Sequence, residues 1–135
     1  MTTRILIVSD AALNAATWSA LTEHGFELTV VENADDGYER LTAGQFDLVV
    51  IGLDRPIESA SIIKWVRAHR KLRQVSILTI AEWGTGGATI ALAQGADAFE
   101  TAPIDGDRLM AAVARLLPKT VMTAKAGGRN GDAQD

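Results

Sequence analysis

The sequence predicts an α/β fold in which five parallel strands form one doubly wound sheet with helices on both faces. Short, continuously apolar runs recur along the chain, segments with helical spacing separate them, and no internal repeat is present. Such runs suit strands that are buried on both faces, as they are in a parallel sheet. Five strands that alternate with five helices in this length favour a single sheet with right-handed crossovers.

The five strands are predicted from four apolar runs and one further strand end. They cover residues 5–8, 28–31, 48–51 and 75–80, and the fifth ends at residues 101–103. In a doubly wound sheet the functional site lies beyond the carboxyl ends of the strands. We therefore expect the functional residues at the carboxyl ends of these strands.

The first two helices are predicted between the first three strands. Apolar residues recur with helical spacing over residues 13–21, and Gly25 follows as a terminating turn. Asn33 is the predicted N-cap of the second helix, with Asp36 near the positive end of the helix dipole. Gly44 is the predicted end of this helix.

The third and fourth helices differ in how clearly the sequence marks them. The third directs apolar residues among 62–66 inward and ends at about His69. The fourth is predicted to begin only near Ala88, because each glycine in the preceding segment 84–87 costs about 1 kcal/mol relative to alanine in a helix interior.

The fifth helix closes the predicted domain. It runs from an Asp105 cap to Pro118, with one apolar stripe that suits packing on a sheet. We therefore predict one domain over residues 1–118. Residues 119–135 are rich in Gly, Ala and polar residues and are predicted to be a flexible C-terminal tail.

Composition excludes several classes of function. A net charge of -4 would repel a phosphate backbone, so we expect no direct binding to nucleic acid. The basic face of Lys64, Arg67, Arg70 and Lys71 is interpreted as solvated surface. The chain has no cysteine, which excludes disulfides and thiolate sites. No segment approaches the ~20 apolar residues that span a bilayer, so we expect no membrane partner and a cytoplasmic location.

Several short motifs occur in a characteristic order. They are Arg-Ile-Leu-Ile-Val at 4–8, Phe-Asp-Leu-Val-Val at 46–50, Leu-Thr at 78–79, Gly-Ala-Asp at 95–97, and the single residues Phe99 and Pro103. In this order and spacing the chain resembles the receiver domain of bacterial response regulators over about residues 4–117. The resemblance implies a flavodoxin-like (βα)5 fold and a place in two-component or phosphorelay signalling.

The resemblance also implies a chemistry whose parts are missing here. Receiver domains take a phosphoryl group from a histidine kinase onto an aspartate, assisted by Mg²⁺ between acidic groups and by a lysine. The matching positions hold Gly52 for the aspartate, Ser9 and Asp10 for the acidic pair, and Ala102 for the lysine before Pro103. We therefore predict a pseudo-receiver that is not phosphorylated, is not an enzyme, and needs no metal or other cofactor.

Two residues match the parts of the family that respond to phosphorylation. Thr79 matches the hydroxyl residue beside the phosphoryl group, and Phe99 matches the aromatic switch residue. We favour a structural role for both, because each is an ordinary choice in a core. Asp54 could be imagined as a displaced phosphoacceptor or metal ligand, but before Arg55 and Pro56 it is interpreted as a turn residue.

The predicted function is protein binding. The expected surface is formed by the fourth helix, fifth strand and fifth helix, and it binds a signalling partner or a second copy of the chain. Trp83, Phe99, Thr79 and Arg108 are its candidate interaction or switch residues. One alternative is a small-ligand sensor that uses the degenerate pocket at the strand ends. Another is that the chain is one piece of a larger regulator with a separate output domain.

Overall fold

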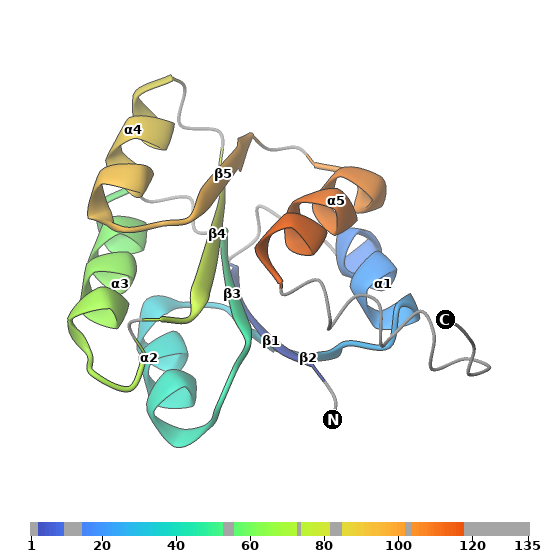
Figure 1. Cartoon of the computed structure of the whole chain (residues 1–135), viewed down its shortest axis with the longest axis horizontal. Coiled ribbons are helices and arrows are strands. Elements are labelled where there is room, and N and C mark those ends of the chain that lie inside the picture. The colour runs from blue at the N-terminus through green and yellow to red at the C-terminus, as the bar shows by residue number, and fades with distance from the viewer. Residues whose placement is uncertain are drawn as a thin grey trace.

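The computed structural model describes residues 3–9, 15–52, 56–72, 74–81, 85–101 and 104–117. These residues form five strands that alternate with five helices (Figure 1). In chain order the elements are β1 (Arg4–Ser9), α1 (Ala15–Glu23), β2 (Glu27–Val31), α2 (Ala34–Ala43), β3 (Leu48–Gly52), α3 (Pro56–Ala68), β4 (Ser76–Ala81), α4 (Thr85–Gln94), β5 (Ala98–Thr101) and α5 (Gly106–Leu116).

The strands form one parallel sheet in the order β2-β1-β3-β4-β5. The chain moves outward from β1 in one direction to β2 and in the other direction through β3 to β5. This order is that of the flavodoxin-like doubly wound folds, whose sites lie where the direction reverses. The predicted fold class is confirmed.

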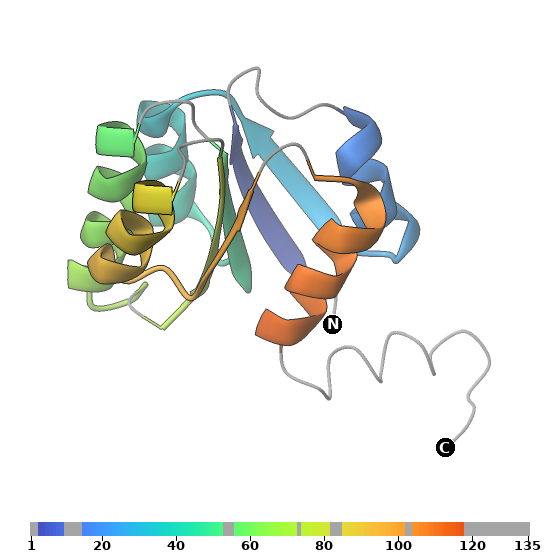
Figure 2. The same cartoon turned by 90° about the horizontal axis from the view of Figure 1, so that it is seen from above.

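Helices cover both faces of the sheet, as Figure 2 shows: α1 and α5 lie on one side, and α2, α3 and α4 lie on the other. Each face holds a separate group of buried apolar residues. The α1/α5 core contains Ile5, Ile7, Trp18, Leu21, Phe26, Leu48, Val50, Leu78, Ile80, Ile104, Leu109, Ala112, Val113 and Leu117. The α2–α4 core contains Leu6, Val8, Val31, Ala34, Leu41, Val49, Ile51, Ile62, Ile63, Val66, Ile77, Ala91 and Ala96.

The two cores explain why the strands are continuously apolar. Successive side chains of a strand point to opposite faces, so β1 sends Ile5 and Ile7 into one core and Leu6 and Val8 into the other. All four side chains are fully buried. A strand that is covered on both sides has no face on which a polar residue would be solvated.

Both predicted helix caps are confirmed. The side-chain oxygen Oδ1 of Asn33 accepts a hydrogen bond from the backbone N–H of Asp36 at 2.8 Å. Asp105 caps α5 in the same way, with its Oδ1 accepting from the N–H of Arg108 at 2.8 Å. Gly44 ends α2 as predicted, and its N–H donates to the carbonyl of Arg40.

The prediction for the start of the fourth helix was wrong. Helix α4 begins at Thr85, three residues before the predicted start near Ala88. Gly86 and Gly87 therefore occupy its first turn. The glycine penalty is measured in helix interiors, whereas the first turn has few intrahelical hydrogen bonds for glycine to weaken. None of the described helices is both long and apolar enough to cross a membrane.

The other end of the chain is only partly described. Helix α5 ends at Leu116, and Leu117 follows it as a buried C-cap residue. The predicted terminator Pro118 and the predicted tail at 119–135 lie outside the described residues.

One arginine connects three elements beneath α4. The guanidinium of Arg67 on α3 donates to the backbone carbonyls of Gly95 at 2.8 Å and Val75 at 2.7 Å, and it forms an ion pair with Asp97 at 2.7 Å. The same carboxylate accepts from the N–H of Ile77 at the start of β4. Gly95 has a φ of +119°, which favours glycine, and an added Cβ would lie 2.6 Å from Cγ of Arg67.

Candidate functional site

The candidate site is the edge of the sheet where the strands end. In the register of the sheet, Ser9 at the end of β1 lies opposite Gly52 at the end of β3. Ile51 lies opposite Thr79 of β4, and Thr79 lies opposite Phe99 of β5. The structure therefore brings together four of the residues that the sequence singled out.

The two residues at the centre of this edge, Gly52 and Ser9, carry no acidic group. Gly52 is buried and has no side chain, and Ser9 beside it is also buried, with 3% of its surface exposed. Neither residue supplies a carboxylate. A phosphoryl group that arrived at the end of β3 would find no nucleophile on Gly52.

Thr79 and Phe99 form the part of the edge that faces the α2–α4 core. Leu78 and Ile80 belong to the α1/α5 core, so strand alternation directs Thr79 to the opposite face. Phe99 packs against the α2–α4 core and is half-buried. The Thr79 side chain is fully buried, and its Oγ1 has no hydrogen-bond partner among the described residues.

Ser59 carries a second buried hydroxyl, which was not predicted from the sequence. It lies on α3, is fully buried, and has no partner for its Oγ in the described part of the chain. It precedes Ile62 and Ile63 of the α2–α4 core by three and four residues, and this helical spacing was the available signal. Buried hydroxyls are normally hydrogen-bonded. Two on the same side of the sheet that have no partner among the described residues therefore need an explanation.

Five predicted site residues lie outside the described residues: Asp10, Asp54, Trp83, Ala102 and Pro103. The interpretation of Asp54 as a turn residue therefore stays a prediction. Within the described ranges, no cluster of three His, Asp or Glu side chains is arranged to hold a metal ion.

Arg108 lies at the start of α5 in a small ionic cluster with β5. Its guanidinium contacts Oε1 of Glu100 at 3.0 Å, and Arg115 contacts Oε2 of the same carboxylate at 2.8 Å. Glu100 is 19% exposed, whereas both arginines are more than half exposed. Arg108 therefore joins α5 to β5 and still presents much of its side chain to solvent.

Helix α4 presents apolar side chains to solvent. Ala91 is buried in the α2–α4 core, while Ile90 and Leu92 beside it are 45% and 48% exposed. The sequence of α4 contains no charged residue. A surface helix ordinarily has a polar outer face, so this composition is unusual for a helix that faces solvent.

Solved receiver domains share this fold. The chemotaxis response regulator CheY4 of Vibrio cholerae has a TM-score of 0.78 at 17% identity, over 87% of this chain and 100% of that one. A signal receiver domain from Bermanella marisrubri has a TM-score of 0.76 at 24% identity, over 86% and 98% of the two chains. The chain therefore has the flavodoxin-like receiver fold.

The sequence is also similar to a curated bacterial regulatory protein. The chain is 30% identical over 112 residues to the transcriptional regulatory protein DltR of Streptococcus agalactiae. The match covers 82% of this chain and 50% of DltR, so the chain spans about half the length of the curated relatives it matches. No protein-family model matches the sequence.

Proposed function

We propose that the chain is a receiver module of two-component or phosphorelay signalling that works without being phosphorylated and acts by binding a protein. The observation that carries this proposal is the end of β3, where Gly52 lies buried beside Ser9. The receiver fold and the resemblance to DltR support the signalling role.

Loss of phosphorylation is proposed because the necessary groups are replaced together. Phosphoryl transfer to a receiver needs a carboxylate nucleophile, charge neutralisation by a metal, and a cation near the transferred oxygens. The sequence places Gly52, Ser9 and Ala102 at three of the matching positions. We therefore propose that the chain is not an enzyme.

The proposed binding surface is formed by α4, β5 and α5. Ile90 and Leu92 supply exposed apolar area on α4, and Arg108 supplies a charged group on α5. Interfaces combine apolar anchors with arginine in this way. The occupant is a signalling protein or a second copy of the chain. Trp83, proposed for the same surface, lies outside the described residues.

Phosphorylation is tested first, by intact-mass spectrometry after incubation with Mg²⁺ and acetyl phosphate. We expect no added phosphoryl group on this chain, while a receiver that retains its aspartate gains one under the same conditions. A Gly52→Asp variant of this chain is a second comparison, because it restores a nucleophile in the same surroundings. A phosphoryl group mapped to Asp54 or Asp10 in the unaltered chain would contradict the proposal.

The binding surface is tested with a double variant, Ile90→Ser/Leu92→Ser. We expect it to weaken self-association, measured by sedimentation, or binding to a cognate signalling protein, measured by pull-down. The loss should be roughly tenfold, because truncating a buried interface anchor typically costs about 1–2 kcal/mol or more.

The matched control for this test is Val30→Ser. Val30 is also a large apolar residue, 50% exposed, but it lies on β2 at the opposite edge of the sheet. Two outcomes would count against the α4 surface. One is an equal loss of binding in the double variant and in Val30→Ser, and the other is no association in either variant or in the unaltered chain.

A second candidate function is small-ligand sensing at the strand ends. The buried hydroxyls of Thr79 and Ser59 favour it, because neither has a hydrogen-bond partner among the described residues and a polar ligand would supply one. A metabolite panel tests it by thermal shift, since a ligand that binds only the folded state raises the unfolding midpoint. A shift that Thr79→Val abolishes would support sensing, and an unresponsive panel would leave protein binding as the function.

A further inference from the structure

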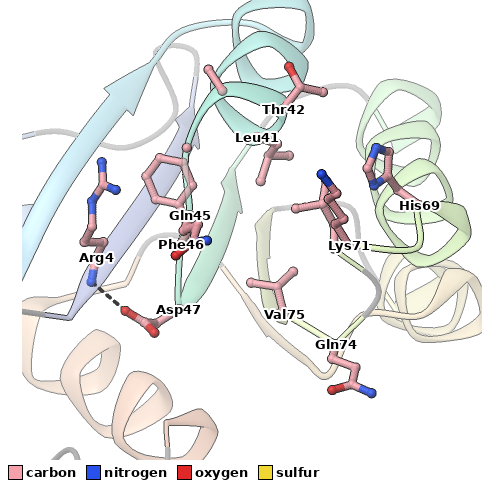
Figure 3. A pocket seen from close by; sticks show the side chains of 13 residues that line it. Arg4, Leu41, Thr42, Gln45, Phe46, Asp47, His69, Lys71, Gln74 and Val75 are labelled. Carbon is pink, nitrogen blue, oxygen red and sulfur yellow. Dashed lines mark hydrogen bonds between the residues drawn. The ribbon is translucent and has the colours of Figure 1, made fainter.

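A groove lies at the edge of the sheet opposite the strand ends discussed above. It borders the amino ends of three strands: Arg4 begins β1, Asp47 precedes β3, and Val75 precedes β4. Figure 3 shows its two sides, with Phe46 and Asp47 in the α2–β3 connection facing His69 and Lys71 in the segment after α3. Its volume is about 1200 Å³.

The groove is large and has a mixed lining, in which apolar side chains lie among polar and charged ones. Leu41 is fully buried in its wall, and Phe46, Leu72 and Val75 are half-buried. Pockets for small molecules usually measure ~300–1,000 Å³ and enclose most of their ligand. A larger groove with half-buried apolar side chains suits a length of polypeptide that inserts apolar residues between polar ones.

The charges around the groove favour an acidic occupant. Lys71 is exposed and makes no ion pair with any of the described residues. Asp47, the one carboxylate among the described lining residues, accepts a hydrogen bond from the backbone N–H of Arg4 at 2.8 Å. The Arg4 guanidinium lies over the Phe46 ring at 5.1 Å and has a long, exposed contact of 3.7 Å with Glu27.

The surrounding sequence strengthens this positive charge. Residues 70–73 contain three Lys or Arg and no Asp or Glu. Cations at the end of a helix often only complement its dipole, an effect confined to the last turn. Arg67 lies in that last turn and also binds Asp97, but Lys71 lies beyond Ala68, where α3 ends. The position of Lys71 at the groove therefore has no explanation in the helix alone.

We infer that this groove binds an extended segment of a partner protein that carries acidic side chains beside apolar ones. Apolar residues of the segment cover Phe46, Leu72 and Val75, and its carboxylates meet Lys71 and Arg4. Thr42, Gln45 and Gln74 supply exposed polar groups along the rim. This inference concerns a different surface from α4 and does not depend on the proposed function.

The test selects ligands for the full chain from a library of random short peptides displayed on phage. We expect enrichment of peptides that combine Asp or Glu with large apolar residues. Among the described residues, the chemical shifts that such a synthetic peptide changes should belong to 44–47, 69–72 and 74–75. Lys71→Glu should weaken its binding about tenfold by turning attraction into repulsion.

The matched control is Lys64→Glu, which reverses an exposed lysine on α3 that does not line the groove. It should change binding by less than about twofold, since screening limits the reach of an exposed charge. Thermal unfolding of both variants confirms that they fold.

Several outcomes would overturn the inference. They are a library without enrichment, selection of basic or uncharged peptides, shifts confined to α4, or equal effects of the two charge reversals. Displacement of the peptide by an equal concentration of succinate would also overturn it, because the groove would then be a site for small dicarboxylates.

Discussion

Tyr38 illustrates how the packing of two helices changes the chemistry of a single side chain. Its ring meets Trp65 edge-on, with 4.8 Å between the centroids, and Trp65 in turn contacts His69. Burial raises the pKa of the Tyr38 hydroxyl above its ordinary value of 10.0, and the nearby carboxylates Asp35 and Glu58 raise it further. Both causes disfavour the phenolate.

The raised pKa predicts a loss of stability at high pH. Below pH 10 the tyrosine is protonated in both states, but above it the unfolded chain releases the proton first and is favoured. Because Tyr38 is the only tyrosine, its ionisation can be followed by absorbance at about 295 nm. We expect a midpoint above 10, and stability that falls more steeply above pH 10 than in Tyr38→Phe. Identical pH profiles would refute this assignment.

The residues at the strand ends were predictable for a topological reason. Parallel strands end at one edge, so the order of apolar runs was enough to place Ser9, Gly52, Thr79 and Phe99 together. Ser59 was not predicted, because a serine on an apolar helical stripe is indistinguishable in sequence from one that is hydrogen-bonded. Whether its Oγ has a partner depends on three-dimensional packing.

Among the elements, α3, β4 and the turn between α4 and β5 are joined through Arg67. Its guanidinium satisfies two backbone carbonyls and one carboxylate, and only glycine at position 95 leaves room for its stem. The Gly-Ala-Asp motif at 95–97 therefore has a structural explanation: the glycine admits the arginine, and the aspartate binds it.

Removing this connection should destabilise the fold. We expect Arg67→Ala to lower the free energy of unfolding by about 2–3 kcal/mol, because it leaves partly buried acceptors without charged donors. Gly95→Ala should lower the free energy of unfolding by about 1–3 kcal/mol through backbone strain. The contact of the added Cβ with Arg67 should lower it further. Urea denaturation measures both, with Lys64→Ala as the exposed control. If Arg67→Ala lowered the free energy of unfolding no more than Lys64→Ala does, the contacts of Arg67 would not be needed for stability.

The start of α4 shows where prediction of elements failed. Capping by Asn33 and Asp105 depends on one side chain and the next turn, so local sequence was sufficient for α2 and α5. For α4 the local glycine content was misleading, because Gly86 and Gly87 lie in the first turn, where the glycine penalty of a helix interior does not apply. The groove was missed because its two sides are separated in the sequence by the whole of α3.

At the scale of the molecule, one sheet separates two cores that do not share side chains. Leu21 belongs to the α1/α5 core and Ile62 to the α2–α4 core, and both are fully buried. We expect Leu21→Ala and Ile62→Ala each to lower the free energy of unfolding by roughly 2–5 kcal/mol. Because every strand contributes to both cores, unfolding followed by tryptophan emission and by circular dichroism should coincide in each variant. Separate transitions would mean that the cores unfold independently.

The glycine that ends β3 affects how long a signal from this domain can last. Gly52 has no side chain that a kinase could phosphorylate and a phosphatase could dephosphorylate. Under the proposed function, no covalent modification at this position therefore persists after a stimulus ends. The strength of its output then follows the concentrations of the chain and its partner relative to their dissociation constant. Its duration is set by the residence time of the complex, and lasting change requires synthesis or degradation of one of the two proteins.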